Sequence, residues 1–380
     1  MSMQSLWSTR HSPDSDAPLA GVRGFLSGVR ILDLSQYISG PFASLMLADM
    51  GAEVLKVEPP RGDEMRNLGP RDGAGDAVFY SALNAGKSAV RLDLKSAADV
   101  ATLWDHIVTA DVLIEGFRPG VMARLGLDYP ALKARRPELI YCSISGYGPT
   151  GPLALRAGHD GNYLATSGIM DRNGQGAPAF FDPPVADMAG ALFAAIAILG
   201  ALHGRHASGV GSHIELGLAD TLMPLQMLQI AEWGANGTVP KSGSTYLNGA
   251  AAFYQTYATA DARHVMLGPV EPKFWANFCE AAGRPDWIGR HADRMPQTNL
   301  IAELSSFFIA QTLEEVTGRF AHVECCLSPV LDLGEALTSA QVAARELVGK
   351  SGDALQAWFP ATFDGQVAPP RAALNKMDAA

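Results

Sequence analysis

The stretch "VRILDLSQYISGPFASLMLADMGAEVLKVE", residues 29–58, has two short apolar runs on either side of a longer one. Residues 29–34 and 53–58 are rich in Val, Ile and Leu, which predicts two buried strands. Residues 40–51 begin and end with glycine and are long enough for a helix. A strand, a helix and a second strand in this order predict a βαβ unit, whose two strands run parallel.

The same alternation continues through the first 150 residues. Further strands are predicted over residues 89–94, 112–117 and 139–148, with helices over 97–109 and from residue 121. Repeated βα units of this kind predict an α/β fold with a doubly wound parallel sheet. Ligands bind such sheets beyond the carboxyl ends of the strands, so the loops after residues 34, 58, 117 and 145 form the expected binding rim.

The second half of the chain has a different pattern. Apolar helices are predicted over residues 187–202 and 219–231, followed by a glycine-rich hinge over 234–249. Residues 252–268 alternate like a hairpin that turns at 261–263, and helices follow around 274–281 and 300–308. These elements predict a smaller α+β domain.

Composition narrows the class of protein. The 380 residues suggest two domains, and 48 % apolar with 18 % charged residues is typical of a well-buried globular chain. A net charge of −10 argues against nucleic acid or anionic lipid as a partner. The longest apolar run, residues 188–202, is shorter than the ~20 residues of a membrane span, so no membrane segment is expected. The four cysteines match no zinc spacing, which predicts no metal site and a cytoplasmic location.

Three titratable residues stand out as catalytic candidates. His159 lies beside Asp160 in "RAGHDGNYLATSG", a stretch with little other charge, although a lone histidine is more often a core residue. Asp187 comes just before an apolar helix, where its carboxylate could cap the helix or act as a base or nucleophile. Glu271 precedes a proline after a predicted strand. These patterns alone predict a two-domain enzyme with an acid–base cleft.

The stretch "SALNAGKS", residues 81–88, is similar to a phosphate-binding loop but begins with serine where that motif requires glycine. Lys87 together with Arg61, Arg66 and Arg71 could still bind phosphates electrostatically. Solvated surface charges are the equally plausible alternative.

Several motifs, taken in order, resemble the family III CoA transferases, which include a racemase branch, the alpha-methylacyl-CoA racemases. The motifs are residues 28–60, which end in "KVEPP", then "NAGKSAVRLDLKS" from residue 84, "ADVLIEGFRPGVMARLGL" from residue 110 and "SGYGPTGP" from residue 145. The segment "GHDGNYLATSG" is similar to that of the racemases, whereas the transferases usually carry an aromatic residue at position 159. Asp187 follows His159 by 28 residues and Glu271 follows Asp187 by 84, which is close to the racemase arrangement.

The resemblance implies a domain organisation. Residues 1–27 would be a flexible extension, and 28–217 a large CoA-binding domain that is completed by about 345–380. A connecting helix and hinge over 218–248, a small α+β domain over 249–329 and a linker over 330–344 complete the expected chain. Two chains would interlock as a homodimer, with each active site between the large domain of one and the small domain of the other.

The resemblance also implies a reaction, the interconversion of (R)- and (S)-2-methylacyl-CoA thioesters. His159 and Asp187 would serve as the two acid–base groups on opposite faces of the substrate, with an enolate between them. Glu271 would hydrogen-bond His159, and the backbone N–H of Asp160 would donate to the enolate oxygen. Two alternatives remain open: a CoA transferase in which Asp187 forms an acyl anhydride, and a non-catalytic acyl-CoA binder.

No cofactor is expected beyond the CoA moiety of the substrate. The family's CoA-binding positions correspond in this sequence to Tyr37, Ile38, Ser39, Arg61, Leu83, Asn84, Lys87, Gly116, Phe117 and Arg124. Arg118 and Lys87 are expected to contact phosphate. The chain departs from the formyl-CoA transferases at Gly116, where they carry Asn, and at Ser145, where they carry Lys.

Overall fold

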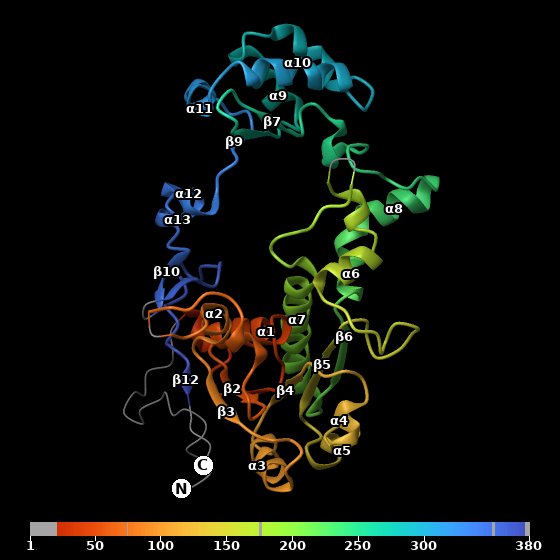
Figure 1. Cartoon of the computed structure of the whole chain (residues 1–380), viewed down its shortest axis with the longest axis vertical. Coiled ribbons are helices and arrows are strands. Elements are labelled where there is room, and N and C mark those ends of the chain that lie inside the picture. Colours follow the sequence, from red (N-terminus) through yellow and green to blue (C-terminus); the bar gives the residue numbers. More distant parts are fainter. Residues whose placement is uncertain (1–20, 74, 175–176, 352–353, 377–380) are drawn as a thin grey trace. The chain divides into compact units, whose positions relative to one another are not determined.

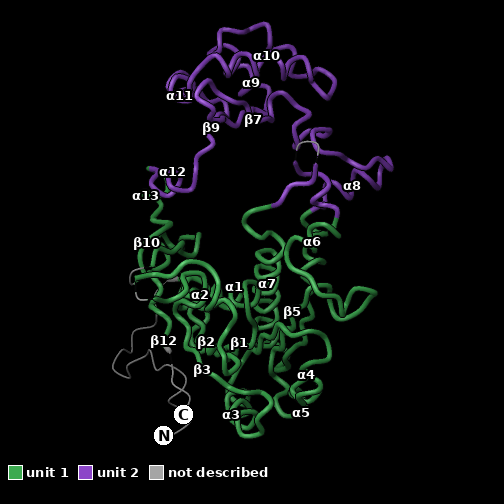
Figure 2. Tube along the Cα trace, in the orientation of Figure 1, with its two compact units in different colours: residues 1–167, 181–225, 340–380 green, residues 168–180, 226–339 purple. Residues whose placement is uncertain are grey.

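The computed structural model describes residues 21–73, 75–174, 177–351 and 354–376. The chain divides into two compact units, coloured green and purple in Figure 2. Unit 1 comprises residues 1–167, 181–225 and 340–380, and unit 2 comprises 168–180 and 226–339. Each unit is described by itself.

Unit 1 is built on one parallel sheet with the strand order β12-β3-β2-β1-β4-β5-β6 (Figure 1). The strands are β1 (Arg30–Asp33), β2 (Glu53–Glu58), β3 (Ser88–Arg91), β4 (Val112–Glu115), β5 (Ile140–Ser145), β6 (His213–Gly217) and β12 (Asn375–Lys376). The predicted α/β fold with a parallel sheet is confirmed. Strand β6 was not predicted, because exposed His213 and Glu215 interrupt its apolar pattern at the edge of the sheet.

Helices cover the sheet and include one long apolar helix. They are α1 (Ser39–Asp49), α2 (Val78–Asn84), α3 (Ala97–Ile107), α4 (Val121–Arg124), α5 (Tyr129–Arg135), α6 (Asp160–Thr166) and α7 (Val185–Ser208). Helix α7 is longer than the predicted 187–202 and has the length and composition of a membrane span. It packs against α1, α6, β5 and β6, as the core helix of an α/β unit does.

The C-terminal segment is part of unit 1. Helix α13 (Ala340–Ala344) and the hairpin of β10 (Val348–Ser351) and β11 (Ala354–Ala357) lead to β12, which pairs with β3. The Arg371 guanidinium donates to both carboxylate oxygens of Asp49 at the end of α1, each at 2.7 Å. Both side chains of this ion pair are buried.

Unit 2 contains an antiparallel sheet of β7 (Gln255–Ala258), β8 (His264–Leu267) and β9 (Leu327–Pro329). It also contains α8 (Met227–Asn236), α9 (Pro272–Ala281), α10 (Thr298–Ile309), α11 (Leu313–Phe320) and α12 (Leu333–Leu337). Trp275, Trp287, Phe278 and Phe308 form its aromatic core. The predicted hairpin and the helices of this domain are confirmed.

Some sequence boundaries were wrong. The helix predicted over 219–231 begins only at Met227, because residues 220–222 and 224–226 form 3-10 turns around Pro224. Residues 1–20 of the expected extension lie outside the described residues. Residues 21–27 are not a flexible extension, since they form a 3-10 turn with Val22 and Leu26 buried.

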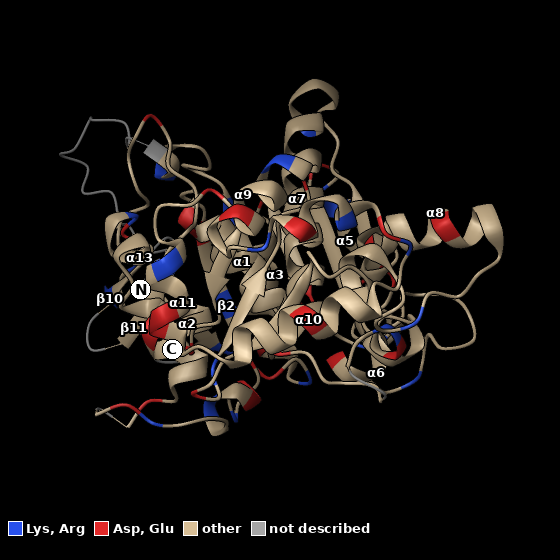
Figure 3. Cartoon of the chain, turned by 90° about the horizontal axis from the view of Figure 1, so that it is seen from above, with Lys and Arg blue, Asp and Glu red and all other residues tan. Residues whose placement is uncertain are grey.

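Charged residues are distributed over both units. In the ribbon of Figure 3, positions of Lys and Arg and positions of Asp and Glu are interspersed over the described elements.

Candidate active site

The segment from the end of β1 into the first turn of α1, residues 35–41, forms one wall of the site, and we refer to it as the site turn. Tyr37 adopts a positive φ of 65°, which is uncommon for a residue with a side chain. A Cβ atom on Gly40 would lie 2.0 Å from Ser35 Oγ, so only glycine allows the turn to fold back on itself. The turn places Ser39 at the first position of α1.

Asp187 lies in the first turn of α7 and faces this wall. Its Oδ1 accepts a hydrogen bond from Ser39 Oγ at 2.9 Å. The prediction that Asp187 caps the helix is wrong, because Pro184 occupies the N-cap and Asp187 is already helical. The free N–H groups of Ala186 and Asp187 instead donate to Asp160 Oδ1, at 2.7 and 3.2 Å. Capping by Asp160 therefore leaves the Asp187 carboxylate available for chemistry.

His159 precedes α6 as its N-cap residue and is exposed. Its backbone N–H donates to Asn162 Oδ1 at 3.0 Å, which fixes the start of the helix. The His159 ring lies edge-on to the Tyr37 ring, with 6.5 Å between the centroids. The Asp160 side chain, next in sequence to His159, accepts from the N–H groups of Ala186 and Asp187, so the start of α6 lies against the start of α7.

Burial is the main influence on the pKa of Asp187 and raises it above the usual aspartate range. The negative charge of Asp160 also raises this pKa, whereas the Ser39 hydrogen bond and the His159 charge lower it. A carboxyl group with a raised pKa can both accept and return a proton closer to neutral pH. This is the property that an acid–base catalyst requires.

Two substitutions next to Asp187 are expected to shift its pKa in opposite directions. Ser39→Ala removes a donor to the carboxylate and raises the pKa, while Asp160→Asn removes a negative charge and lowers it. Asparagine keeps a side-chain oxygen for the α7 N–H groups, so capping persists. A carboxyl ¹³C NMR titration of labelled protein, with Asp187→Asn used to assign the signal, measures both shifts. Equal pKa values in the two variants would contradict this account.

Tyr163 supports the loop before His159. Its hydroxyl donates to Gly158 O at 2.6 Å, and its ring packs edge-on against Tyr147. Tyr147 also lines a pocket of about 230 Å³, together with residues that include Leu153 and Met223. All residues that line this pocket belong to unit 1, so the pocket lies within that unit.

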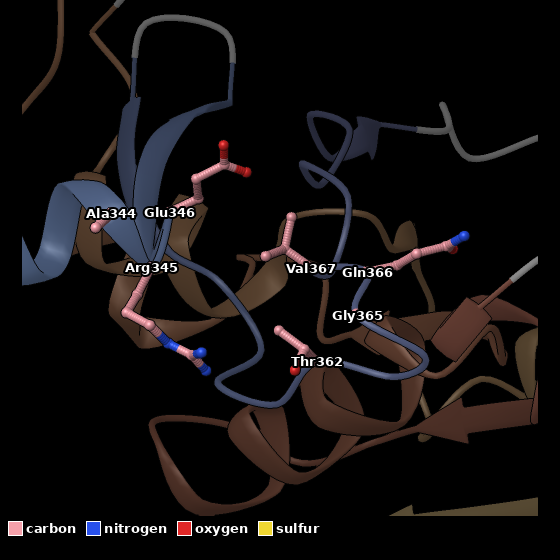
Figure 4. Close-up of a pocket in the computed structure, with 7 residues that line it drawn as sticks. All are labelled: Ala344, Arg345, Glu346, Thr362, Gly365, Gln366 and Val367. Atoms are coloured by element: carbon pink, nitrogen blue, oxygen red, sulfur yellow. The ribbon is translucent and has the colours of Figure 1, made fainter.

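A larger hollow of about 510 Å³ lies on the C-terminal segment of unit 1 (Figure 4). Arg345, Glu346, Thr362 and Gln366 line it together with small and apolar residues. None of the predicted catalytic or CoA-binding residues is among its lining residues.

Most of the predicted CoA-binding residues lie in loops that follow strands of the parallel sheet. Tyr37, Ile38 and Ser39 follow β1, Arg61 follows β2, and Gly116, Phe117 and Arg118 follow β4. The carboxyl ends of parallel strands meet at one edge of a sheet, so these loops share that edge. Arg61, Arg118 and Arg124 are exposed, and Leu83 is half-buried in α2.

Two side chains in this set cannot contact CoA as expected. Lys87 is fully buried, and its Nζ donates to Asn84 Oδ1 at 2.9 Å and to Pro41 O at 2.8 Å. Asn84 is buried as well. The prediction of a phosphate contact through the Lys87 side chain is therefore wrong, because its ammonium group points into the core.

Glu271 belongs to unit 2, where it is the N-cap residue of α9 and is exposed. Its expected hydrogen bond to His159 stays a prediction. Within the described residues no group of three or more His, Cys, Asp or Glu side chains is placed to hold a metal ion.

Sequence reasoning missed two features of the site. Ser39 was expected only as a CoA-binding residue, and its hydrogen bond to Asp187 crosses 148 positions of sequence. Asp160 was expected to contribute only its backbone N–H, although its side chain caps α7. An acidic residue that caps a helix other than its own leaves no local sequence signal.

Comparison with known proteins agrees with this fold. The family model for CoA-transferase family III matches residues 26–373. Similar proteins include an acetyl-CoA:oxalate CoA-transferase of Acetobacter aceti, 32% identical over 90% of each chain. The human alpha-methylacyl-CoA racemase is 32% identical over 82% of this chain and 78% of its own. The crystal structure of a CaiB/BaiF family protein from Brucella suis superposes with a TM-score of 0.81 at 28% identity, covering 93% of this chain and 96% of the other. With nearly its whole length matched, the chain belongs to CoA-transferase family III.

Proposed function

We propose that this protein is a racemase that interconverts (R)- and (S)-2-methylacyl-CoA thioesters. The observation that supports the proposal is the contact between the two helix starts: the Asp160 side chain, next to His159, accepts from the N–H groups of Ala186 and Asp187 at the start of α7. Inverting a carbon centre by proton transfer requires one group on each face, and an imidazole and a carboxyl of raised pKa suit both roles.

The proposed reaction moves one proton off the substrate and returns another. The C2–H bond next to the thioester carbonyl breaks when one of the two groups takes the proton, and the electron pair moves onto the carbonyl oxygen as an enolate. The protonated second group then donates to C2 from the opposite face, and the carbonyl re-forms. In the reverse direction His159 and Asp187 exchange roles.

The enolate oxygen carries the charge that develops during the reaction. Asp160 is the first residue of α6, so its backbone N–H has no carbonyl partner within the helix. This N–H and the positive end of the helix dipole would stabilise the enolate. The Asp160 carboxylate is engaged with α7 through its Oδ1, so the two functions of this residue use different atoms.

The homodimer and the role of Glu271 are also proposals. Leu192 and Ile196 on α7 and Met227, Leu228 and Trp233 on α8 are large apolar side chains that are exposed in the single chain. Exposed apolar groups of this kind mark association surfaces, and we propose that a second copy of the chain covers them. In the interlocked dimer, Glu271 of one chain would orient His159 of the other.

Mixing two inactive variants tests a shared site. We expect Asp187→Asn and Glu271→Gln homodimers to be impaired, because each lacks one group in both sites. A heterodimer formed by co-expression carries one intact site if Glu271 comes from the partner chain, so about half the activity per heterodimer returns. Activity of the heterodimer no higher than that of the better homodimer would contradict a shared site.

A CoA transferase is the second candidate, and a specific observation favours it: several of the similar proteins are transferases, such as the succinyl-CoA:glutarate CoA-transferase of Mus musculus. In this reaction the Asp187 carboxylate would attack the thioester carbonyl and release CoA as a thiolate. The second acid would then displace the first acid from the aspartyl anhydride, and the CoA thiolate would attack the new acyl carbonyl, which forms the new thioester and regenerates the Asp187 carboxylate. This route needs Asp187 but leaves His159 without a defined role.

Solvent exchange separates the two candidates. A racemase incorporates deuterium at C2 of a 2-methylacyl-CoA in D₂O without any added carboxylic acid, and the product is racemic. A transferase shows no exchange at C2, but hydroxylamine traps its acylated Asp187 as a hydroxamate. Trapping without exchange would overturn the racemase proposal. If the protein catalyses neither exchange nor transfer with any acyl-CoA thioester of a panel, the result would indicate a non-catalytic acyl-CoA binder.

A further inference from the structure

Two lysine side chains lie fully buried next to the site turn, and the proposed reaction uses neither. Lys56 and Lys87 are both 0 % exposed. A buried ammonium group is unfavourable unless it is paired and hydrogen-bonded. Lys87 Nζ lies 3.3 Å from Asp33 Oδ2, and Lys56 Nζ lies 2.9 Å from Asp63 Oδ2.

Each lysine also donates to a backbone carbonyl at one end of the site turn. Lys56 Nζ donates to Ser35 O at 2.9 Å, and Lys87 Nζ donates to Pro41 O at 2.8 Å. Ser39, which donates to Asp187, lies between these two carbonyls. The lysines therefore bind the two ends of the segment that holds one of the proposed catalytic groups.

The site turn needs such restraint because its backbone is unusual. A residue other than glycine at positive φ, as Tyr37 is, persists only where the surrounding contacts determine its conformation. Asp33 adds further contacts, accepting from the Ser35 backbone N–H at 3.0 Å and from the Ser35 hydroxyl. Its second oxygen accepts from Ser44 Oγ, which itself accepts from Lys87.

The charges of this cluster are mutually dependent. Burial alone would raise the pKa of Asp33, but Lys56, Lys87 and the two serine hydroxyls outweigh it and lower the pKa to about 2. Burial lowers the pKa of Lys87, and Asp33 acts against that effect. Removing one member leaves the others as buried, unbalanced charges.

We propose that Lys87 and Lys56 are positioning residues that hold the site turn so that Ser39 Oγ stays on Asp187 Oδ1. Neither lysine contacts the substrate. They act on the pKa of Asp187 only through the turn and Ser39. The assignment of a catalytic role to Asp187 rests on the proposed function, but the link between Lys87 and Asp187 can be measured without any substrate.

The test combines an NMR titration with a double-mutant cycle. Lys87→Met is expected to raise the pKa of Asp187 in the same direction as Ser39→Ala, because both lose the Ser39 hydrogen bond. The double variant Ser39→Ala/Lys87→Met should show the same pKa as Ser39→Ala alone. If Lys87 acted instead by its charge across space, the two shifts would add. Additive shifts, or no shift in Lys87→Met, would overturn the proposal.

Arg205→Met is the matched structural control. Arg205 pairs with Asp111 at 2.9 Å near the other end of α7, so its loss destabilises the helix that carries Asp187 without touching the site turn. The melting temperature of the Arg205→Met variant is expected to fall, while the pKa of Asp187 in that variant stays unchanged. If Lys87→Met does not fold, Ser44→Ala removes one Lys87 contact at lower cost and is expected to shift the pKa of Asp187 in the same direction.

Kinetics then separate this inference from the proposed function. If the racemase proposal holds, kcat in Lys87→Met falls by up to about 10²-fold with KM nearly unchanged, as expected for a misplaced catalytic group. If the wild-type protein shows no C2 exchange, the proposed function fails. The Asp187 titration still decides whether Lys87 holds the turn.

Discussion

His159→Gln and Asp187→Asn are each expected to reduce racemisation by about 10²- to 10⁴-fold, the range that a general acid–base group contributes. Each variant retains one of the two groups. The remaining group can still remove and return a proton on its own face, so each variant exchanges C2–H with D₂O in one enantiomer without inverting it. The two variants should therefore exchange opposite enantiomers, which chiral analysis of the recovered thioesters measures.

The rival mechanism gives a different pattern. A transferase loses activity in Asp187→Asn, retains most of it in His159→Gln and exchanges no C2 proton in either variant. His213→Gln provides a matched control, because His213 stacks on Tyr129 with 4.7 Å between ring centroids and contacts none of the site residues named above. Exchange of the same enantiomer by both variants would contradict the placement of His159 and Asp187 on opposite faces.

The parallel sheet was predictable because its central strands are buried on both faces. Residues 53–58 were predicted without error, since five of the six are buried and the run lies between Gly51-Ala52 and Pro59. Strand β6 escaped prediction for the opposite reason. As an edge strand it exposes His213 and Glu215, and its pattern resembles a loop.

Residue types singled out His159 and Asp187 as candidates, but not the hydrogen bonds around them. His159 could be selected because the stretch around it is similar to the racemase segment, and Asp187 because it lies at the start of an apolar helix, 28 residues after His159. The role of Lys87 could not be read from its motif, since a lysine in a glycine-containing loop suggests phosphate binding whether its side chain points outward or inward. Its buried partners decide its direction, and two of them, Asp33 and Pro41, are 54 and 46 positions away in the sequence.

The C-terminal segment contributes a long-range contact that the sequence does not reveal. Arg371 and Asp49 are 322 positions apart, and both are almost fully buried. Arg371 also donates to Ala357 O at 2.7 Å, and Ser351 Oγ donates to Arg371 O at 2.6 Å. These bonds join the C-terminal segment to the last residue of α1. The first residue of the same helix, Ser39, donates the hydrogen bond to Asp187.

Arg371→Met is expected to reduce the free energy of unfolding of unit 1 by about 3–5 kcal/mol, because it leaves the Asp49 carboxylate buried without its partner. Asp49→Leu combined with Arg371→Met should recover much of this loss, since no charge then remains buried. Arg61→Met is the control, because its pair with Glu64 is solvent-exposed and contributes at most about 1 kcal/mol. Urea denaturation gives the free energies, and hydrogen exchange of residues 39–49 and 354–376 identifies where the protein opens. A loss as small as that of Arg61→Met would mean that the C-terminal segment stays bound through its backbone pairing with β3 alone, and that the ion pair adds little to it.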